Sequence, residues 1–144
     1  MLKSKLRFFL IFLIFSVIFS GCKNDNNYIP YVYVNTYVYL SDPEFYELNA
    51  VGNAVFYDYE GYKGIIIFRK SMDEFLVFDR CCSYDPTTEC EIVEKTDDSY
   101  LVKCDCCGSI YSLYDGYPLE GPAALPLKSY NLTFDGNNTL HIYN

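Results

Sequence analysis

The chain has 144 residues with 11 basic and 19 acidic side chains, which gives a formal net charge of −8 and a sequence pI near 4.5. Hydrophobic residues make up 51% of the sequence and the mean hydropathy is +0.00, so intrinsic disorder and a membrane protein with many spans are both excluded. The acidic balance argues against a nucleic-acid partner, because phosphate binding needs clustered Lys and Arg. The single His excludes any metal site built from two imidazoles.

The N-terminus has the pattern of an export signal. Three basic residues precede a 12-residue apolar run, residues 8–19, which is followed by two small residues and Cys22. This run is shorter than the roughly 20 apolar residues that span a bilayer. Its ending resembles the bacterial lipoprotein signal, in which cleavage precedes a Cys that then receives lipid. We therefore expect residues 1–21 to be a signal peptide and residues 22–34 to be a lipidated cysteine and tether. The expected location is the periplasmic side of a membrane, the outer membrane or the cell surface.

Residues 35–144 are predicted to form one all-β domain of about eight to ten short strands. The apolar stretches are short, rich in Tyr, Val, Ile and Phe, and separated by turn residues. No stretch of ten residues has the period of an amphipathic helix, although residues 42–48 could form a helical turn. The predicted strands, in chain order, are residues 31–40, 54–59, 65–69, 74–79, 92–94, 99–103, 110–114, 132–134 and 140–143.

Two features of these strands are interpreted as structural. The alternating tyrosines of the first strand, Tyr31, Tyr33, Tyr37 and Tyr39, fit packing within a sheet. His141 lies in the last predicted strand, with no nucleophile motif beside it. No catalytic residue is therefore predicted.

Six cysteines remain once Cys22 is set aside, and they form two groups. These are Cys81, Cys82 and Cys90, then Cys104, Cys106 and Cys107. A Cys-X-X-Cys-Gly turn, here residues 104–108, is typical of a metal knuckle. Six thiols in a small exported β-domain are also typical of three disulfides. The sequence leaves both interpretations open.

The order of these motifs resembles the Rieske iron–sulfur family, and most closely its Rieske-like lipoproteins of the Bacteroidetes type. Residues 78–84 stand in place of the first ligand box and residues 104–111 in place of the second. Gly121 and Pro122 resemble the loop that covers the cluster. The resemblance implies three stacked antiparallel sheets with a small cluster-binding subdomain at about residues 78–126.

The ligand positions depart from the family pattern. The two Cys ligands of a Rieske centre fall on Cys82 and Cys104, whereas the two His ligands fall on Tyr84 and Cys107. Both His positions are thus replaced, and Tyr84 is a degenerate ligand position. A standard Rieske centre, which needs two His on one iron, is excluded.

Three ways of completing the site remain. Cys82, Cys90, Cys104 and Cys107 could hold a 2Fe–2S cluster or a single iron, or the same thiolates could hold Zn²⁺. All six cysteines could instead be oxidised, with no metal. The resemblance also implies a disulfide between Cys90 and Cys106, which competes for Cys90.

The expected function is that of a membrane-anchored, cysteine-ligated metal or cluster module, with an electron-transfer role and a redox partner protein implied by the resemblance. The alternative is the same fold without a cluster, held by disulfides or zinc and acting as a surface binding or assembly module. Neither is an enzyme by itself, because Rieske oxygenases carry an additional catalytic iron domain for which this chain has no room.

Overall fold

The computed structural model describes residues 29–144, and within this range the chain forms ten strands and one 3-10 helix. In chain order they are β1 (Asn35–Tyr39), η1 (Pro43–Asn49), β2 (Ala54–Tyr57), β3 (Ile65–Arg69), β4 (Phe75–Asp79), β5 (Val93–Lys95), β6 (Leu101–Cys104), β7 (Ile110–Ser112), β8 (Pro118–Glu120), β9 (Asn131–Phe134) and β10 (Thr139–Tyr143). The predicted signal peptide and Cys22 lie outside the described residues.

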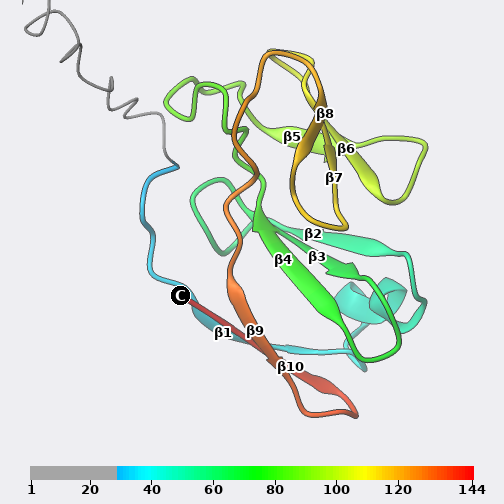
Figure 1. Ribbon diagram of the computed structural model, residues 1–144. Helices are drawn as coiled ribbons and strands as arrows, with labels where there is room; N and C mark the ends of the chain where they lie inside the picture. Colours follow the sequence, from blue (N-terminus) through cyan, green and yellow to red (C-terminus); the bar gives the residue numbers. More distant parts are fainter. Residues whose placement is uncertain (1–28) are drawn as a thin grey trace, which may run out of the picture.

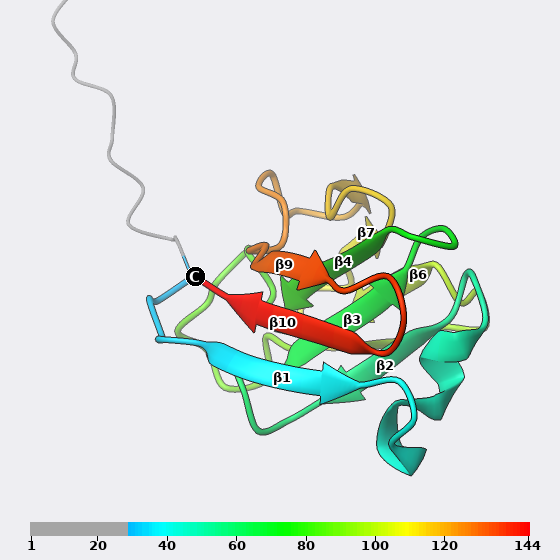
Figure 2. The same cartoon turned by 90° about the horizontal axis from the view of Figure 1, so that it is seen from below.

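The strands form three antiparallel sheets, in the orders β1-β10-β9, β2-β3-β4 and β5-β6-β7-β8. The sheet β2-β3-β4 is the middle layer: it lies between the other two in Figure 1, and Figure 2 shows β1, β10 and β9 passing across it. The predicted fold class, all-β with stacked antiparallel sheets and a cysteine-rich part, is confirmed.

The middle strand β3 explains why the layers stack. All five of its residues are buried, as expected for an apolar run with a sheet on each side. Ile65 and Ile67 join the hydrophobic cluster beneath β1-β10-β9, and Ile66 and Phe68 join the one beneath β5–β8. Successive side chains of a strand point to opposite faces, so one strand supplies both cores.

The third sheet is inserted in the chain between β4 and β9. Its strands have three or four residues each, and longer loops precede and follow it (Figure 1). The loop before this sheet carries Cys81, Cys82 and Cys90, whereas Cys104 ends β6 and Cys106 and Cys107 lie in the turn between β6 and β7. The cysteine-rich part is therefore a small sheet with loops, resting on the middle layer.

The start of the folded part differs from the prediction. Residues 31–34 are not a strand, yet Val34 is 0% exposed and Ile29 is 3% exposed. The side chain of Asn144 bonds the amide N–H of Val34 and the carbonyl of Val32, which ties this segment to the C-terminus. Ile29 and Val34 therefore pack on the domain, at the end of the segment predicted as the tether.

The four tyrosines of the predicted first strand do not pack into the core, although Tyr37 stacks on His141 of the paired strand β10. Tyr31, Tyr33, Tyr37 and Tyr39 are 49–72% exposed. Within β1 the buried side chain is Val38, because the alternation of the strand turns its neighbours Tyr37 and Tyr39 toward solvent.

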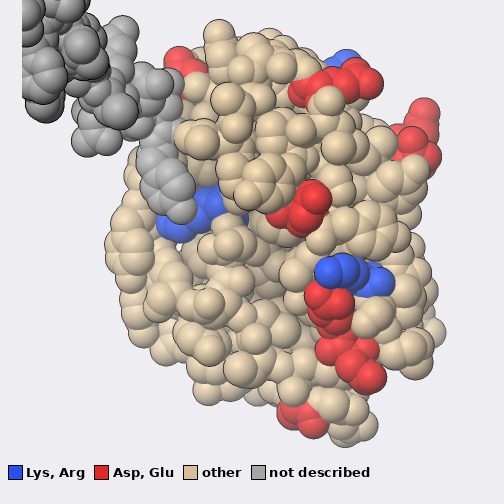
Figure 3. Space-filling view, viewed as in Figure 1, with Lys and Arg blue, Asp and Glu red and all other residues tan. Residues whose placement is uncertain are grey.

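One face of the domain illustrates how its charged side chains are placed. On the face shown in Figure 3, acidic side chains are scattered and do not gather into one patch. Among the described residues, no helix has the length and hydrophobicity needed to cross a membrane.

Candidate metal centre

Two loops bring the cysteines together. The first follows β4 and contains Cys81, Cys82 and Cys90; it is closed by hydrogen bonds from the Cys82 amide to the Glu91 carbonyl and from the Val93 amide to the Arg80 carbonyl. These bonds continue the antiparallel pairing of the chain before and after the loop. Cys82 and Glu91 are therefore held side by side, although nine positions separate them.

The second loop is the tight turn between β6 and β7. The amide of Cys104 bonds the carbonyl of Ser109 at 2.8 Å, and the amide of Gly108 bonds the carbonyl of Cys104 at 3.0 Å. Gly108 has a φ of +77°, a left-handed conformation that other residues rarely adopt, and this explains the glycine of the motif. The turn directs Cys104 and Cys107 toward the first loop.

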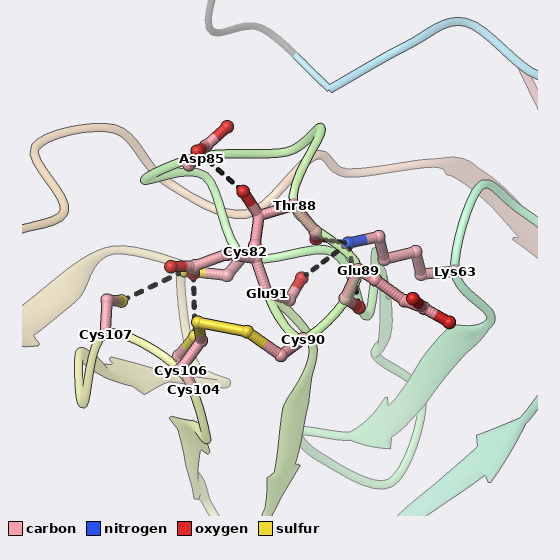
Figure 4. The surroundings of a disulfide bond; sticks show 10 residues. All are labelled: Lys63, Cys82, Asp85, Thr88, Glu89, Cys90, Glu91, Cys104, Cys106 and Cys107. Carbon is pink, nitrogen blue, oxygen red and sulfur yellow. Dashed lines mark hydrogen bonds between the residues drawn. A yellow bond between two sulfur atoms is a disulfide. The ribbon is translucent and has the colours of Figure 1, made fainter.

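A disulfide joins the two loops. Cys90 is bonded to Cys106, with their Cα atoms 5.4 Å apart, as the family resemblance implied (Figure 4). The expected metal set included Cys90, and the disulfide removes that thiol from it. The prediction that Cys90 is a metal ligand is therefore wrong.

The residue that takes this place is Glu91. One ligand atom from each of Cys82, Glu91, Cys104 and Cys107 lies within 4.8 Å of the other three. The Sγ atoms of Cys82 and Cys107 are 3.5 Å apart, and the Cys104 thiol donates to Glu91 Oε2 at 2.8 Å (Figure 4). Three of the residues are buried and Cys107 is partly exposed.

The surroundings keep the buried thiols protonated. Burial raises the pKa of Cys82, and a hydrogen bond with Glu91 raises it further. Burial, followed by the hydrogen bond with Glu91, also raises the pKa of Cys104 to about 11. The Cys104 proton thus lies between the Cys104 sulfur and the Glu91 carboxylate. A metal cation that replaced this proton would bind a thiolate and a carboxylate, both negatively charged.

Hydroxyl groups fix the sulfur atoms. Tyr111 is 0% exposed, and its hydroxyl lies 3.2 Å from Cys82 Sγ and 3.0 Å from Ser83 Oγ. The Cys107 thiol donates to Ser109 Oγ at 3.1 Å. Both hydroxyls lie in the interior, so the sulfur positions are set by the fold and not by solvent.

The predicted covering loop lies against the second cysteine turn. The amide of Ala123 donates to Ser109 Oγ at 3.1 Å, and a Cβ on Gly121 would come within 2.5 Å of Ser109 Cα. Only glycine permits this approach, with Pro122 following it. The loop therefore supports Ser109, which in turn contacts Cys107.

Lys63 anchors the end of the first loop. Its ammonium donates to the carbonyls of Thr88, Glu89 and Glu91, the last at 3.2 Å (Figure 4). Three acceptors on one short segment fix the backbone that carries Cys90 and Glu91.

Three other residues considered in the sequence analysis, the degenerate ligand position Tyr84 and the residues Cys81 and His141, lie outside the four-residue cluster. Tyr84 is 46% exposed and meets Cys82 through a backbone hydrogen bond. Cys81 is buried, with its thiol donating to the carbonyls of Cys82 and Pro86. His141 lies on β10, in the sheet at the opposite end of the molecule, stacked on Tyr37 (Figure 1).

Sequence reasoning found three of the four clustered residues and missed Glu91. Cysteines are few and therefore conspicuous, whereas Glu91 is one of 19 acidic residues. In the sequence, only its position directly after Cys90 pointed to a role in the site. The backbone hydrogen bond that places Glu91 beside Cys82 is known only from the structure.

No family model and no curated protein matches the chain. Among solved structures it is similar to a chain of the complex of reduced oxygenase and oxidized ferredoxin in carbazole 1,9a-dioxygenase, with 17% identity, a TM-score of 0.49, and coverage of 74% of this chain and 97% of that one. It is also similar to the ferredoxin of carbazole 1,9a-dioxygenase from Nocardioides aromaticivorans IC177, with 20% identity, a TM-score of 0.44, and coverage of 64% and 86%. Similarity at this level carries no conclusion about function.

Proposed function

We propose that the domain binds one thiolate-preferring divalent ion, zinc or iron(II), through Cys82, Cys104, Cys107 and Glu91. The observation behind this proposal is that the four donor atoms lie within 4.8 Å of one another. Three of the four residues are also buried. Thiolates with one carboxylate are a donor set suited to such ions.

The separations fit a single ion. Zinc lies about 2.3 Å from sulfur in proteins, so two tetrahedral thiolates are roughly 3.8 Å apart. The Cys82 and Cys107 sulfurs are 3.5 Å apart, and Cys104 and Glu91 need only lose their shared proton and separate slightly. A 2Fe–2S cluster holds its ligands on two irons with bridging sulfides between them, so ligands on different irons lie farther apart than the 4.8 Å that spans these four donors.

The ion would add a cross-link to the one that the disulfide already makes. It would join Cys82 and Glu91 of the first loop to Cys104 and Cys107 of the second. Four protein donors close a tetrahedral site, which is typical of structural rather than catalytic metal. We accordingly infer a binding module and no catalysis by this domain alone. Electron transfer stays a prediction that requires iron in the site.

Cobalt(II) tests the site directly, because tetrahedral cobalt with thiolate ligands absorbs visible light strongly. The full chain, purified in detergent and stripped of metal, should take up one equivalent of cobalt with sulfur-to-cobalt charge-transfer bands. Glu91→Gln should retain these bands and weaken binding, because it removes the negative charge of the one oxygen donor. Uptake without thiolate bands would refute the proposal.

We also infer that the chain is exported and anchored by lipid on Cys22. The N-terminal pattern supports this inference, and so does the Cys90–Cys106 disulfide, since such bonds persist in oxidising compartments. Labelling of cells with a radioactive fatty acid should mark the chain, and Cys22→Ser should abolish the label. An unlabelled chain in the soluble fraction would refute the anchor.

A further inference from the structure

We propose that Cys82 and Cys107 are a reactive dithiol, which small disulfide compounds convert into a Cys82–Cys107 disulfide. The two sulfurs are in contact at 3.5 Å, and both cysteines are free. A bond of about 2.05 Å requires them to approach by roughly 1.5 Å, which side-chain rotation and small loop adjustments can supply.

The two thiols differ in access, and this difference orders the reaction. Cys107 is partly exposed, whereas Cys82 is 0% exposed. A disulfide reagent in solution therefore meets Cys107 first. Cys82 lies directly behind it and is placed to react with whatever forms on Cys107.

The exchange balances as two successive displacements. The Cys107 thiolate attacks one sulfur of the reagent, forms a mixed disulfide and expels one thiolate. The Cys82 thiol then passes its proton to the leaving sulfur as it attacks Cys107 Sγ, so that the intramolecular disulfide forms and the second thiol leaves. The two protons lost by the cysteines end on the two expelled thiolates, and the two electrons end in the reduced reagent.

The other cysteines in the described part of the chain are occupied differently. Cys104 donates to Glu91, and Cys81 donates to the carbonyls of Cys82 and Pro86. Cys90 and Cys106 are already joined. Cys104 Sγ also lies within 4.8 Å of both sulfurs, but Cys104 is buried and its thiol donates to Glu91. The 3.5 Å contact and the exposure of Cys107 therefore favour the Cys82–Cys107 pair.

The consequence for the metal rests on the proposed function, whereas the dithiol chemistry does not. Oxidation removes two of the four donors and leaves Cys104 and Glu91. Metal binding and the disulfide are therefore mutually exclusive, and a bound ion should protect both thiols.

The test incubates the metal-free full chain, in detergent, with glutathione disulfide and counts thiols after denaturation. The wild type should lose two thiols, and peptide mapping should link Cys82 to Cys107. Cys82→Ser should stop at one glutathione adduct on Cys107, because the second displacement is gone. Cys81→Ser is the matched control: it removes the adjacent buried thiol and should still lose two.

Retention of all thiols by the wild type, or a link that maps to Cys81 or Cys104, would overturn the proposal. A Cys82→Ser adduct on a residue other than Cys107 would also overturn it. Cobalt uptake by the same metal-free sample separates the two proposals: a chain that forms the disulfide but takes up no cobalt supports the dithiol and refutes the metal site. A chain that binds cobalt but never forms the link does the reverse.

Discussion

The two hydrophobic clusters of the domain differ in composition. The cluster between β1-β10-β9 and β2-β3-β4 contains aliphatic and aromatic side chains only. The cluster between β2-β3-β4 and β5–β8 includes Cys82, Cys104 and Tyr111 among its buried members. The first core contains no cysteine and one buried tyrosine, Tyr130, whereas the second includes two cysteine thiols among its buried side chains.

The comparison shows how the small third sheet is held in place and why its thiols are buried. Strands of three or four residues bury little area, so the cysteine-rich part depends on cross-links between loops: the Cys90–Cys106 disulfide and the contacts of Lys63. Placing the thiols in the core also removes them from water. That burial is the main reason for the raised pKa values of Cys82 and Cys104.

The largest expected effect is on metal binding. Cys104→Ser removes a fully buried ligand, and we expect affinity for cobalt to fall more than about 100-fold, since even changes to groups that only orient ligands cost 10–100-fold. Cys81→Ser, which also replaces a buried thiol, should keep the affinity within a few-fold. Equal losses in both variants would mean that the fold, and not ligation, had been damaged.

Truncation of a side chain in the apolar core should destabilise the whole domain. Ile67→Ala truncates a side chain that is 0% exposed in the middle layer, and we expect a loss of about 2–5 kcal/mol in the free energy of unfolding. Urea unfolding followed by circular dichroism measures this loss. Met72→Ala, at a 67% exposed position, should change the value by less than about 0.5 kcal/mol.

Removal of the disulfide should act locally. Its cysteines are 16 residues apart, and a loop of this size corresponds to a stabilisation of about 3 kcal/mol. In the double variant Cys90→Ala, Cys106→Ala we expect faster amide hydrogen exchange in β5 to β7, with β1 and β10 unchanged. Uniform acceleration over all three sheets would show that the two regions are one cooperative unit.

A smaller effect concerns the contact between the regions. Asp79 is buried and accepts hydrogen bonds from the amides of Tyr62, Lys63 and Cys81 and from the hydroxyl of Tyr130, the last at 2.7 Å. Tyr130→Phe should cost about 1–3 kcal/mol, because it leaves one acceptor of this carboxylate unpaired. Tyr39→Phe, at an exposed position, is the control.

The same tyrosine gives a pH dependence. Burial, followed by the hydrogen bond to Asp79, raises the pKa of Tyr130 above its ordinary value of 10.0. Its stabilising contribution is therefore complete below about pH 10 and is lost as pH rises further, because the unfolded chain ionises first. Unfolding at pH 7.5 and 10.5 should show a smaller alkaline loss for Tyr130→Phe than for the wild type. An identical loss would contradict the assignment.

Strands whose own residues have a clear apolar, β-branched pattern were predicted from the sequence. The run of residues 65–69 is apolar and largely β-branched, and β3 has these bounds. The strand β8 was missed because it begins with Pro118, ends with Glu120 and has only three residues. Its position at the edge of the third sheet tolerates a proline, and pairing with β7, not its own composition, makes it a strand.

The site was predictable only as far as residue type is informative. Cys82, Cys104 and Cys107 were identified because thiols in a knuckle-like spacing point to metal. The disulfide takes Cys90 away, and Glu91 replaces it through backbone pairing that joins the two ends of a loop. This pairing depends on which residues of the two loop ends lie opposite each other after β4. The spacing of residues in the sequence does not determine that register.

The central claim is one ion in a Cys82–Glu91–Cys104–Cys107 site, and the most direct test is the count of metal and acid-labile sulfide per chain. The full chain should be purified without oxygen, with zinc supplied to a portion that has been stripped of metal. We expect one zinc or iron per chain and no sulfide. Two irons with two sulfides per chain, or no uptake of zinc at all, would contradict it.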